Sequence, residues 1–202
     1  MVKNIVFDMG RVLVEYDPMR VCDVFIEKEE DKIKVIDALF HSPEWIEMDR
    51  GSLSEEDAMV IVKERLPEQY LKDAAQKCMD HWDKYNMSPK AGMREVVERM
   101  KQKGYGIYLL SNASLRLRSY QQMIPGIELF DGMIVSAEEL CIKPEARIYQ
   151  ILFDRYQLNP EECFFIDDIQ ENIDGAKACG MEGYCFADGD VERLSTALEQ
   201  LK

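Results

Sequence analysis

The sequence has few of the features that mark secreted, membrane-spanning or zinc-binding proteins. It contains two histidines and six cysteines, and no two cysteines form a C-x-x-C pair. A zinc site is therefore poorly supported, and free cysteines are favoured over a disulfide framework. No apolar run approaches the roughly 20 residues that span a bilayer, and residues 1–7 do not resemble a signal peptide. We therefore expect a reduced, cytoplasmic protein with no membrane partner.

Basic residues are also scarce. The 202 residues include 25 Lys and Arg against 39 Asp and Glu, which gives a formal net charge of −14. Nucleic acids attract clusters of basic side chains, so this balance argues against a nucleic-acid partner. The negative net charge also implies that an anionic substrate would be repelled unless nearby cationic groups reversed the electrostatic field at the binding site. The length and the 47% hydrophobic content suit one compact core with a sizeable insertion.

Short apolar runs predict the strands of a buried parallel sheet. They lie at residues 5–7, 105–110, 132–135, 163–166 and 183–186. Their hydrophobicity is nearly continuous, which is typical of strands covered on both faces. Helical patterns, as at 91–103 and 146–156, alternate with the later strands. The sequence thus predicts an α/β fold with a doubly wound, Rossmann-like parallel sheet.

The segment between the first and second predicted strands is too long for a simple crossover. Residues 14–88 contain several amphipathic helical patterns and no convincing strand, and Ser54 begins a capping arrangement. We therefore expect a helical cap subdomain at 15–88, inserted after the first strand. Residues 1–14 and 89–202 would then form the catalytic core.

Polar residues follow the predicted strands, at the edge where open α/β sheets bind ligands. Taken singly, each has a structural explanation as a turn residue, a helix cap or a solvated charge. Their common position at one edge of the sheet favours a functional site instead. The residues are Asp8, Gly10, Ser111, Asn112, Lys143, Asp167, Asp168 and Asn172.

Phosphoryl transfer is the chemistry that fits these residue types. Two converging carboxylates, Asp8 and Asp168, favour a hard cation such as Mg²⁺. One oxygen of Asp8 could hold the metal while the other attacks phosphorus. Ser111 and Asn112 would donate hydrogen bonds to the phosphate, and Lys143 would neutralise its charge.

Four segments, in order along the chain, resemble the motifs of the haloacid dehalogenase-like hydrolases. They are residues 7–12, 110–112, 143–145 and 165–168, and the resemblance covers the whole chain, including the inserted cap. Residues 49–54 and 143–149 are similar to the branch of bacterial α-glucose-1-phosphate phosphatases and of the phosphatase domains of epoxide hydrolases.

The resemblance implies a Mg²⁺-dependent phosphatase that acts on a small phosphorylated metabolite, such as glucose 1-phosphate, through an aspartyl phosphate. In this scheme Asp8 is the nucleophile and Lys143 the catalytic cation. The implied phosphate-binding residues are Ser111, Asn112 and Lys143, the implied metal ligands are Asp8, the carbonyl of Gly10 and Asp168, and the supporting residues are Asp167 and Asn172.

The sequence departs from the family pattern at Gly10. Most phosphatases of this family have a second Asp at this position, which serves as general acid and base. Loss of a general acid typically costs about 10²–10⁴ in rate. An anomeric sugar oxygen is a better leaving group than a simple alcohol, which would lessen the loss. The alternatives are a catalytically silent phosphate-binding protein, a phosphomutase, which would normally need the second Asp, and, less favoured, a dehalogenase.

The cap is expected to contribute substrate contacts. Trp45, Asp49 and Arg50 are the first candidates, and Arg11 and Glu15 near the first hinge are others. In the alternative interpretation Trp45 packs inside the cap and Arg50 pairs with Asp49 in solvent. None of these residues is assigned a catalytic role, and no pattern indicates an oligomeric state.

Overall fold

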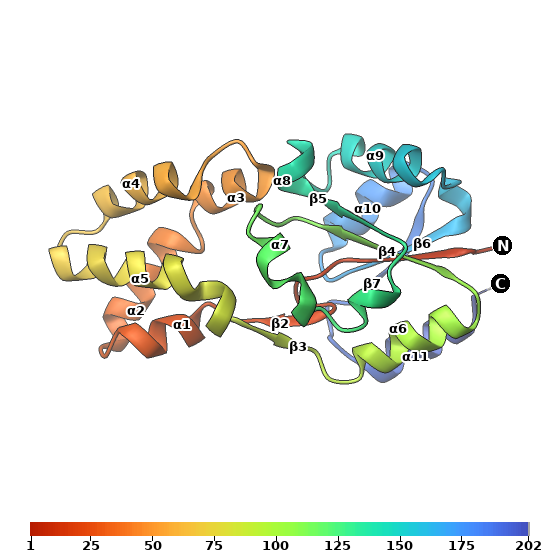
Figure 1. Cartoon of the computed structure of the whole chain (residues 1–202), viewed down its shortest axis with the longest axis horizontal. Helices are drawn as coiled ribbons and strands as arrows, with labels where there is room; N and C mark the ends of the chain where they lie inside the picture. The colour runs from red at the N-terminus through yellow and green to blue at the C-terminus, as the bar shows by residue number, and fades with distance from the viewer. Residues whose placement is uncertain (202) are drawn as a thin grey trace.

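A computed structural model describes residues 1–201 and shows two lobes (Figure 1). The larger lobe is built on a five-stranded sheet in the order β5-β4-β1-β6-β7, and all its strands are parallel. This confirms the predicted doubly wound α/β fold. Lys202, the last residue of the predicted core, lies outside the described residues. The strands are β1 (Asn4–Phe7), β4 (Gly106–Ser111), β5 (Gly132–Val135), β6 (Cys163–Asp167) and β7 (Glu182–Cys185).

Helices cover both faces of this sheet. Along the central strand β1, Ile5 and Phe7 pack into one apolar cluster, whereas Val6 packs into the other. All three side chains are fully buried, so a strand covered on both faces needs apolar residues at successive positions. The helices packed around the sheet are α6 (Met93–Gln102), α9 (Ala146–Tyr156), α10 (Gln170–Ala178) and α11 (Val191–Glu199).

The smaller lobe, called the cap lobe here, consists of helices inserted between β1 and β4 (Figure 1). Its aromatic core includes Trp45, whose ring centroid lies 4.9 Å from that of Phe40 and 5.2 Å from that of Trp82. Ser54 caps its fourth helix by accepting a hydrogen bond from the backbone N–H of Asp57 at 3.0 Å. The helices are α1 (Met19–Phe25), α2 (Glu29–Leu39), α3 (Pro43–Arg50), α4 (Glu55–Arg65) and α5 (Gln69–Tyr85).

The expectation of no strand within residues 14–88 is wrong at both ends of that segment. Strand β2 (Val14–Tyr16) pairs antiparallel with β3 (Met87–Pro89), and the two form a ribbon between the lobes. Each strand has three residues, its partner is distant in sequence, and Pro89 is unusual within a sheet. These strands therefore leave no local pattern that predicts them.

Short elements complete the larger lobe, here called the core lobe. They are α7 (Leu117–Tyr120), α8 (Ser136–Glu139) and the 3₁₀ turns Gln121–Met123, Ile127–Leu129 and Pro160–Glu162. All six cysteines are free. Within residues 1–201, none of the helices is both long and apolar enough to cross a membrane. The carboxyl ends of the sheet strands point toward the cap lobe (Figure 1).

Candidate active site

The ammonium group of Lys143 lies at the centre of a polar network at the carboxyl edge of the sheet. Its Nζ donates hydrogen bonds to Asp8 Oδ1 at 2.6 Å, to Asp167 Oδ2 at 2.7 Å and to the carbonyl oxygen of Leu110 at 2.9 Å. The residue is only 3% exposed. A buried ammonium is tolerated when it is paired and its donors are satisfied, and these three acceptors meet both conditions.

The charges of this network are strongly coupled. Burial alone would lower the pKa of Lys143, but the charges of Asp167 and Asp8 outweigh it and raise the pKa, so the lysine stays charged. Burial raises the pKa of Asp8 to about 7, against the attraction of Lys143. Because two carboxylates share one ammonium, with Asp168 beside them, the site favours an additional cation.

Asp8, Asp167 and Asp168 form the cluster in which such a cation would fit. Each offers a carboxylate oxygen, and these oxygens lie within 4.8 Å of one another. Asp167 is already engaged, since its Oδ1 accepts from the backbone N–H of Ile169 at 2.8 Å and from Asn172 Nδ2 at 3.0 Å, while Oδ2 accepts from Lys143. Asp8 and Asp168 are therefore the better ligands, and an all-oxygen set suits Mg²⁺.

Ser111 and Asn112, both predicted to bind phosphate, have different environments. The Ser111 hydroxyl is buried and has no hydrogen-bond partner within residues 1–201. The Asn112 side chain instead holds the backbone of Lys143: Oδ1 accepts from Lys143 N at 2.8 Å and Nδ2 donates to Lys143 O at 3.1 Å. In this structure the Asn112 amide therefore positions the lysine, and Ser111 has the hydroxyl that is free to meet a ligand.

A cavity of about 390 Å³ extends from Asp8 toward the cap lobe. Residues of both lobes line it, so a bound molecule can contact the core and the cap. The lining includes Asp8, Gly10, Arg11, Tyr16, Trp45, Asp49, Trp82, Asn112, Ser114, Tyr120, Lys143, Asp168 and Asn172.

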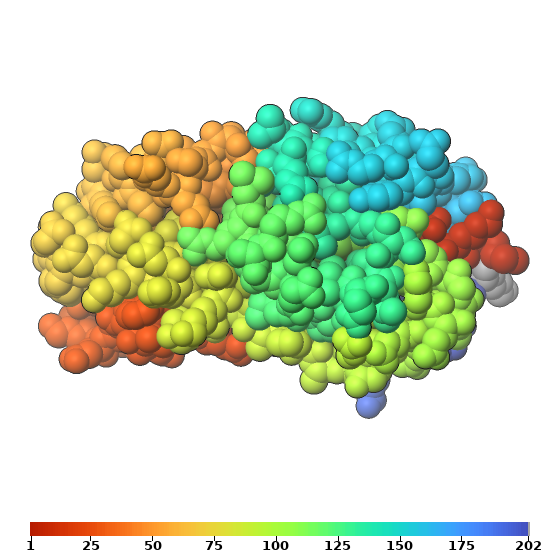
Figure 2. All heavy atoms as spheres, viewed as in Figure 1, coloured from red at the N-terminus to blue at the C-terminus, as the bar shows by residue number. Residues whose placement is uncertain are grey.

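The end of helix α3 docks on the core lobe beside this cavity. The hydroxyl of Ser136 donates a hydrogen bond to the carbonyl oxygen of Asp49 at 2.5 Å, and Arg50 Nη1 pairs with Glu145 Oε1 at 2.5 Å. Gly51 ends the helix with φ 81°, and a Cβ there would lie 2.2 Å from the carbonyl oxygen of Ala137. Figure 2 shows this part of the cap lobe (orange) against the core lobe (teal).

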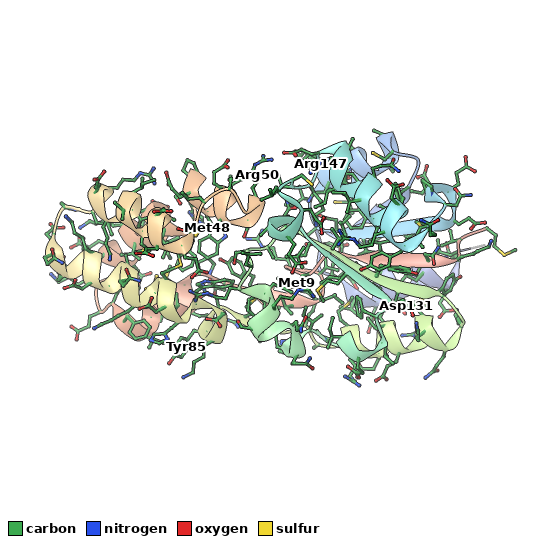
Figure 3. The ribbon with its side chains drawn as sticks, turned by 45° about the horizontal axis from the view of Figure 1, so that its top comes forward. Met9, Met48, Arg50, Tyr85, Asp131 and Arg147 are labelled. Atoms are coloured by element: carbon green, nitrogen blue, oxygen red, sulfur yellow. The ribbon has the colours of Figure 1, made fainter. Side chains whose placement is uncertain are left out.

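The alternative pairing of Arg50 with Asp49 is absent, because Arg50 extends away to Glu145. Figure 3 shows Arg50 at the end of the cap that faces the core, with Arg147 across from it, and Met9 at the junction of the lobes. Trp45 combines both predicted roles, since it packs in the cap core and lines the cavity. Arg11 also lines the cavity.

Glu15 lies outside the cavity lining and pairs with Lys90 at 2.6 Å.

Three hydroxyl groups that line the cavity were not foreseen from the sequence. Those of Tyr16, Ser114 and Tyr120 are buried and have no hydrogen-bond partner within the described chain. Burial raises the pKa of both tyrosines, so their hydroxyls remain protonated donors. They come from β2, from the loop after β4 and from the end of α7, and no local spacing in the sequence unites them.

A second clamp between the lobes, also unforeseen, is formed by Arg116. Its Nε donates to Glu55 Oε1 on α4 at 2.8 Å, and its Nη1 donates to the carbonyl oxygen of Met79 on α5 at 2.7 Å. The guanidinium also lies 5.8 Å from the ring centroid of Trp82, within cation–π range. This arginine therefore ties two cap helices to the core beside the cavity.

The family model of the haloacid dehalogenase-like hydrolases matches residues 2–180. A sesquiterpene phosphatase of Aspergillus oryzae is 25% identical over 200 residues, which cover 98% of this chain and 94% of that protein. The D-ribitol-5-phosphate phosphatase of Bacteroides thetaiotaomicron is 25% identical over 196 residues, which cover 91% of each chain.

Solved structures share the fold. A haloacid dehalogenase family enzyme of Bacteroides thetaiotaomicron, in complex with magnesium and inorganic phosphate, superposes with a TM-score of 0.67 at 22% identity, covering 91% of this chain and 93% of that one. A predicted hydrolase of the same family from Porphyromonas gingivalis superposes with a TM-score of 0.72 at 23% identity over 100% of both chains.

Proposed function

The chain belongs to the haloacid dehalogenase-like hydrolases, and from this premise we propose that it is a Mg²⁺-dependent phosphatase of small phosphorylated metabolites. The observation that carries the proposal is the buried Lys143 ammonium bridging Asp8 and Asp167 beside Asp168. Relatives named as phosphatases that align over more than nine-tenths of this chain support it.

In this proposal Asp8, the carbonyl of Gly10 and Asp168 would hold Mg²⁺. The ion, when bound, offsets the charge of the carboxylates and of the incoming phosphate. Asp167 does not bind the metal but holds Lys143, and Asn172 in turn braces Asp167 through a hydrogen bond of 3.0 Å.

The reaction proceeds through this chain's own groups in two steps. A carboxylate oxygen of Asp8 attacks phosphorus and forms an aspartyl phosphate, while the charge of the Lys143 ammonium offsets the charge of the phosphate and the Ser111 hydroxyl donates a hydrogen bond to a phosphate oxygen. Water then attacks phosphorus, the bond to Asp8 breaks and inorganic phosphate leaves.

We assign residues 1–14 and 89–202 to the catalytic core and residues 15–88 to the cap. The cap supplies the part of the cavity wall that surrounds the organic portion of the substrate and keeps bulk water from the aspartyl phosphate. The contacts of Asp49 and Arg50 with the core support the role of the cap as a wall of the catalytic cavity.

The proposed substrate is a phosphorylated sugar or polyol, with glucose 1-phosphate as the first candidate. A cavity of about 390 Å³ is of the size that small metabolites occupy. The buried hydroxyls of Tyr16, Ser114 and Tyr120 need hydrogen-bond partners, which the hydroxyls of a sugar would supply. The anomeric oxygen is also the better leaving group, so glucose 1-phosphate should be cleaved faster than glucose 6-phosphate.

The test is a phosphate-release screen over sugar, polyol, terpenoid and aryl phosphates, with and without Mg²⁺, using the wild type and Asp8→Asn. We expect Mg²⁺-dependent release that falls at least about 10³-fold in Asp8→Asn, because the amide cannot attack phosphorus. Asp80→Asn, on the exposed face of α5, is the matched control and should keep full activity.

Failure to release phosphate from any compound, despite Mg²⁺ binding, would indicate a silent phosphate-binding protein. Chloride release from 2-chloropropionate without metal would indicate a dehalogenase, and conversion of glucose 1-phosphate to glucose 6-phosphate a phosphomutase. Equal rates on the two glucose phosphates would remove the argument for the anomeric leaving group.

A further inference from the structure

Cleavage of an alkyl or sugar phosphate leaves an oxygen that must receive a proton, and the groups around Asp8 do not supply one. Lys143 and Asp167 are bonded to each other and to other fixed partners. Asp168 is assigned to the metal. Gly10 has no side chain, and a Cβ at this position would meet no atom of the described chain within 4 Å. The proton donor must therefore come from another part of the cavity wall.

Asp49 is a carboxyl group of the cap lobe that lines the same cavity. It lies in the last turn of α3, is only partly exposed, and lines the cavity together with Asp8. No basic side chain within residues 1–201 forms an ion pair with it, and its neighbour Arg50 pairs with Glu145 instead. The carboxyl is therefore free to face a bound molecule.

The backbone around Asp49 is anchored to the core lobe. Its carbonyl oxygen accepts from Ser136 at 2.5 Å, and the hydroxyl of Ser136 in turn accepts from the backbone N–H of Ala113 at 2.8 Å. Gly51 packs directly against the backbone of Ala137. This anchoring ties the backbone of Asp49 to the loop that follows β4, next to the catalytic edge of the sheet.

The electrostatic environment keeps this carboxyl protonated near neutral pH. Burial raises the pKa of Asp49 to about 8; the charge of Asp8 adds to the rise, and the backbone N–H of Ser114 opposes it. The position of Asp49 at the negative end of the α3 dipole acts in the same direction as burial. A group with a pKa near the working pH can both donate and accept a proton efficiently.

We propose that Asp49 is the catalytic acid–base residue of the reaction, delivered from the cap. The proposal rests on the phosphatase function stated above. As Asp8 attacks phosphorus, the bond from phosphorus to the leaving oxygen breaks, and that oxygen takes the proton of Asp49 and departs as an alcohol. Asp49, now a carboxylate, takes a proton from the water that attacks the aspartyl phosphate. The bond to Asp8 then breaks, hydrogen phosphate leaves, and Asp49 is protonated again.

Other titratable or charged groups line this cavity and bear on a pH profile. His41 accepts or donates one hydrogen bond with Asp37 at 3.1 Å, and the Tyr16 and Tyr120 hydroxyls lie near enough to Asp49 for its charge to raise the pKa of each. The remaining groups are Asp8, Arg11, Lys143 and Asp168.

The test compares two leaving groups in Asp49→Asn, a nearly isosteric change. p-Nitrophenolate leaves without a proton, whereas an alkoxide requires one. We expect kcat/KM for an alkyl or sugar phosphate to fall about 10²–10⁴-fold and kcat/KM for p-nitrophenyl phosphate to change less than about 5-fold. Turnover of p-nitrophenyl phosphate should then show a burst of one nitrophenolate per enzyme, because the phosphorylated enzyme lacks a base.

The pH profile supplies a second measurement. The wild-type kcat/KM for the alkyl phosphate should decline above about pH 8, as Asp49 loses its proton, and the decline should be absent in Asp49→Asn. Asp80→Asn on exposed α5 should match the wild type throughout.

Equal losses on both phosphates, or no loss on either, would show that Asp49 is not the acid while leaving the phosphatase function intact. A wild type that releases no phosphate at all would instead refute the function itself.

The open space at Gly10 permits a third test. A carboxyl at this position would reach the same region beside Asp8, so Gly10→Asp should restore alkyl-phosphate cleavage in the Asp49→Asn background. In the wild-type background, Gly10→Asp should increase kcat/KM for the alkyl phosphate by a factor at least about 10-fold smaller, because an acid is already present. Equal gains in both backgrounds would contradict the role of Asp49.

Discussion

Ser111 illustrates how a single residue can be shaped for a ligand rather than for stability. Ser111 is the last residue of strand β4 and follows Leu110, whose carbonyl oxygen binds Lys143. Its hydroxyl is buried and has no hydrogen-bond partner among the described residues. An unsatisfied buried polar group costs about 1–3 kcal/mol of folding free energy. Such a group is retained most simply if a phosphate oxygen accepts its hydrogen bond during the reaction.

Ser111→Ala therefore separates binding from stability. We expect the inhibition constant for inorganic phosphate, measured with Mg²⁺ present, to rise about 10-fold or more, since a hydrogen bond to a charged group is lost. The thermal midpoint should stay level or increase slightly, because the unpaired hydroxyl is removed. An unchanged phosphate affinity would show that Ser111 does not contact the ligand.

At the scale of elements, the end of α3 is the structural link between the cap and the chemistry. Gly51 is left-handed, and its Cα approaches Ala137 so closely that no other residue fits. The adjacent carbonyl oxygen of Asp49 is bonded to Ser136. A change at this contact should displace Asp49 from the cavity without touching any group that meets the substrate.

Gly51→Ala and Gly104→Ala form a matched pair for this contact. Both glycines have positive φ, 81° and 89°, but a Cβ at Gly104 would meet no atom of residues 1–201 within 4 Å. Gly104→Ala should cost only the left-handed strain of about 1 kcal/mol, or roughly 2–4 °C in thermal midpoint. Gly51→Ala should lower the midpoint further and reduce kcat/KM about 10²-fold, as expected for a misplaced group near the reaction.

Equal thermal midpoints and equal kcat/KM in the two glycine variants would mean that the close approach to Ala137 does not position the cap.

At the scale of the whole molecule, the protein concentrates acidic groups where they oppose folding. It carries a net charge of −14, and several carboxyls converge on one cavity. Asp49 binds its proton more tightly in the folded chain than in the unfolded chain, since its pKa rises from 3.8 to about 8. Unfolding between these pH values therefore releases a proton, and the stability contributed by Asp49 is lost as the pH rises toward 8.

Asp49→Asn removes this loss of folding stability at higher pH, because the amide does not titrate. The variant should have a higher thermal midpoint than the wild type at pH 8 in EDTA, by at least about 4 °C, and the difference should shrink as the pH approaches 5. Scanning calorimetry from pH 5 to 9 would check the result, with exposed Asp80→Asn as the control. A difference in thermal midpoint between Asp49→Asn and the wild type that does not vary with pH would contradict the raised pKa of Asp49.

Local hydrophobic patterns in the sequence determined the α/β architecture and the edge of the sheet at which the site lies. Continuous apolar runs at 5–7 and 163–166 predicted buried parallel strands, because such strands need apolar side chains on both faces. The parallel topology brings the residues after these two strands together, so Asp8 and Asp168 lie in one acidic cluster, and the Lys143 ammonium is bonded to Asp8.

Only the tertiary structure decided how the cap meets this edge. The contacts between Asp49 and Ser136 and between Gly51 and Ala137 join segments far apart in the chain, and their spacing in sequence carries no information about them. The same is true of the unpartnered hydroxyls of Tyr120 and Ser114. Periodicity reports which face of an element is buried, whereas the docking of one lobe on another depends on the shape of both surfaces.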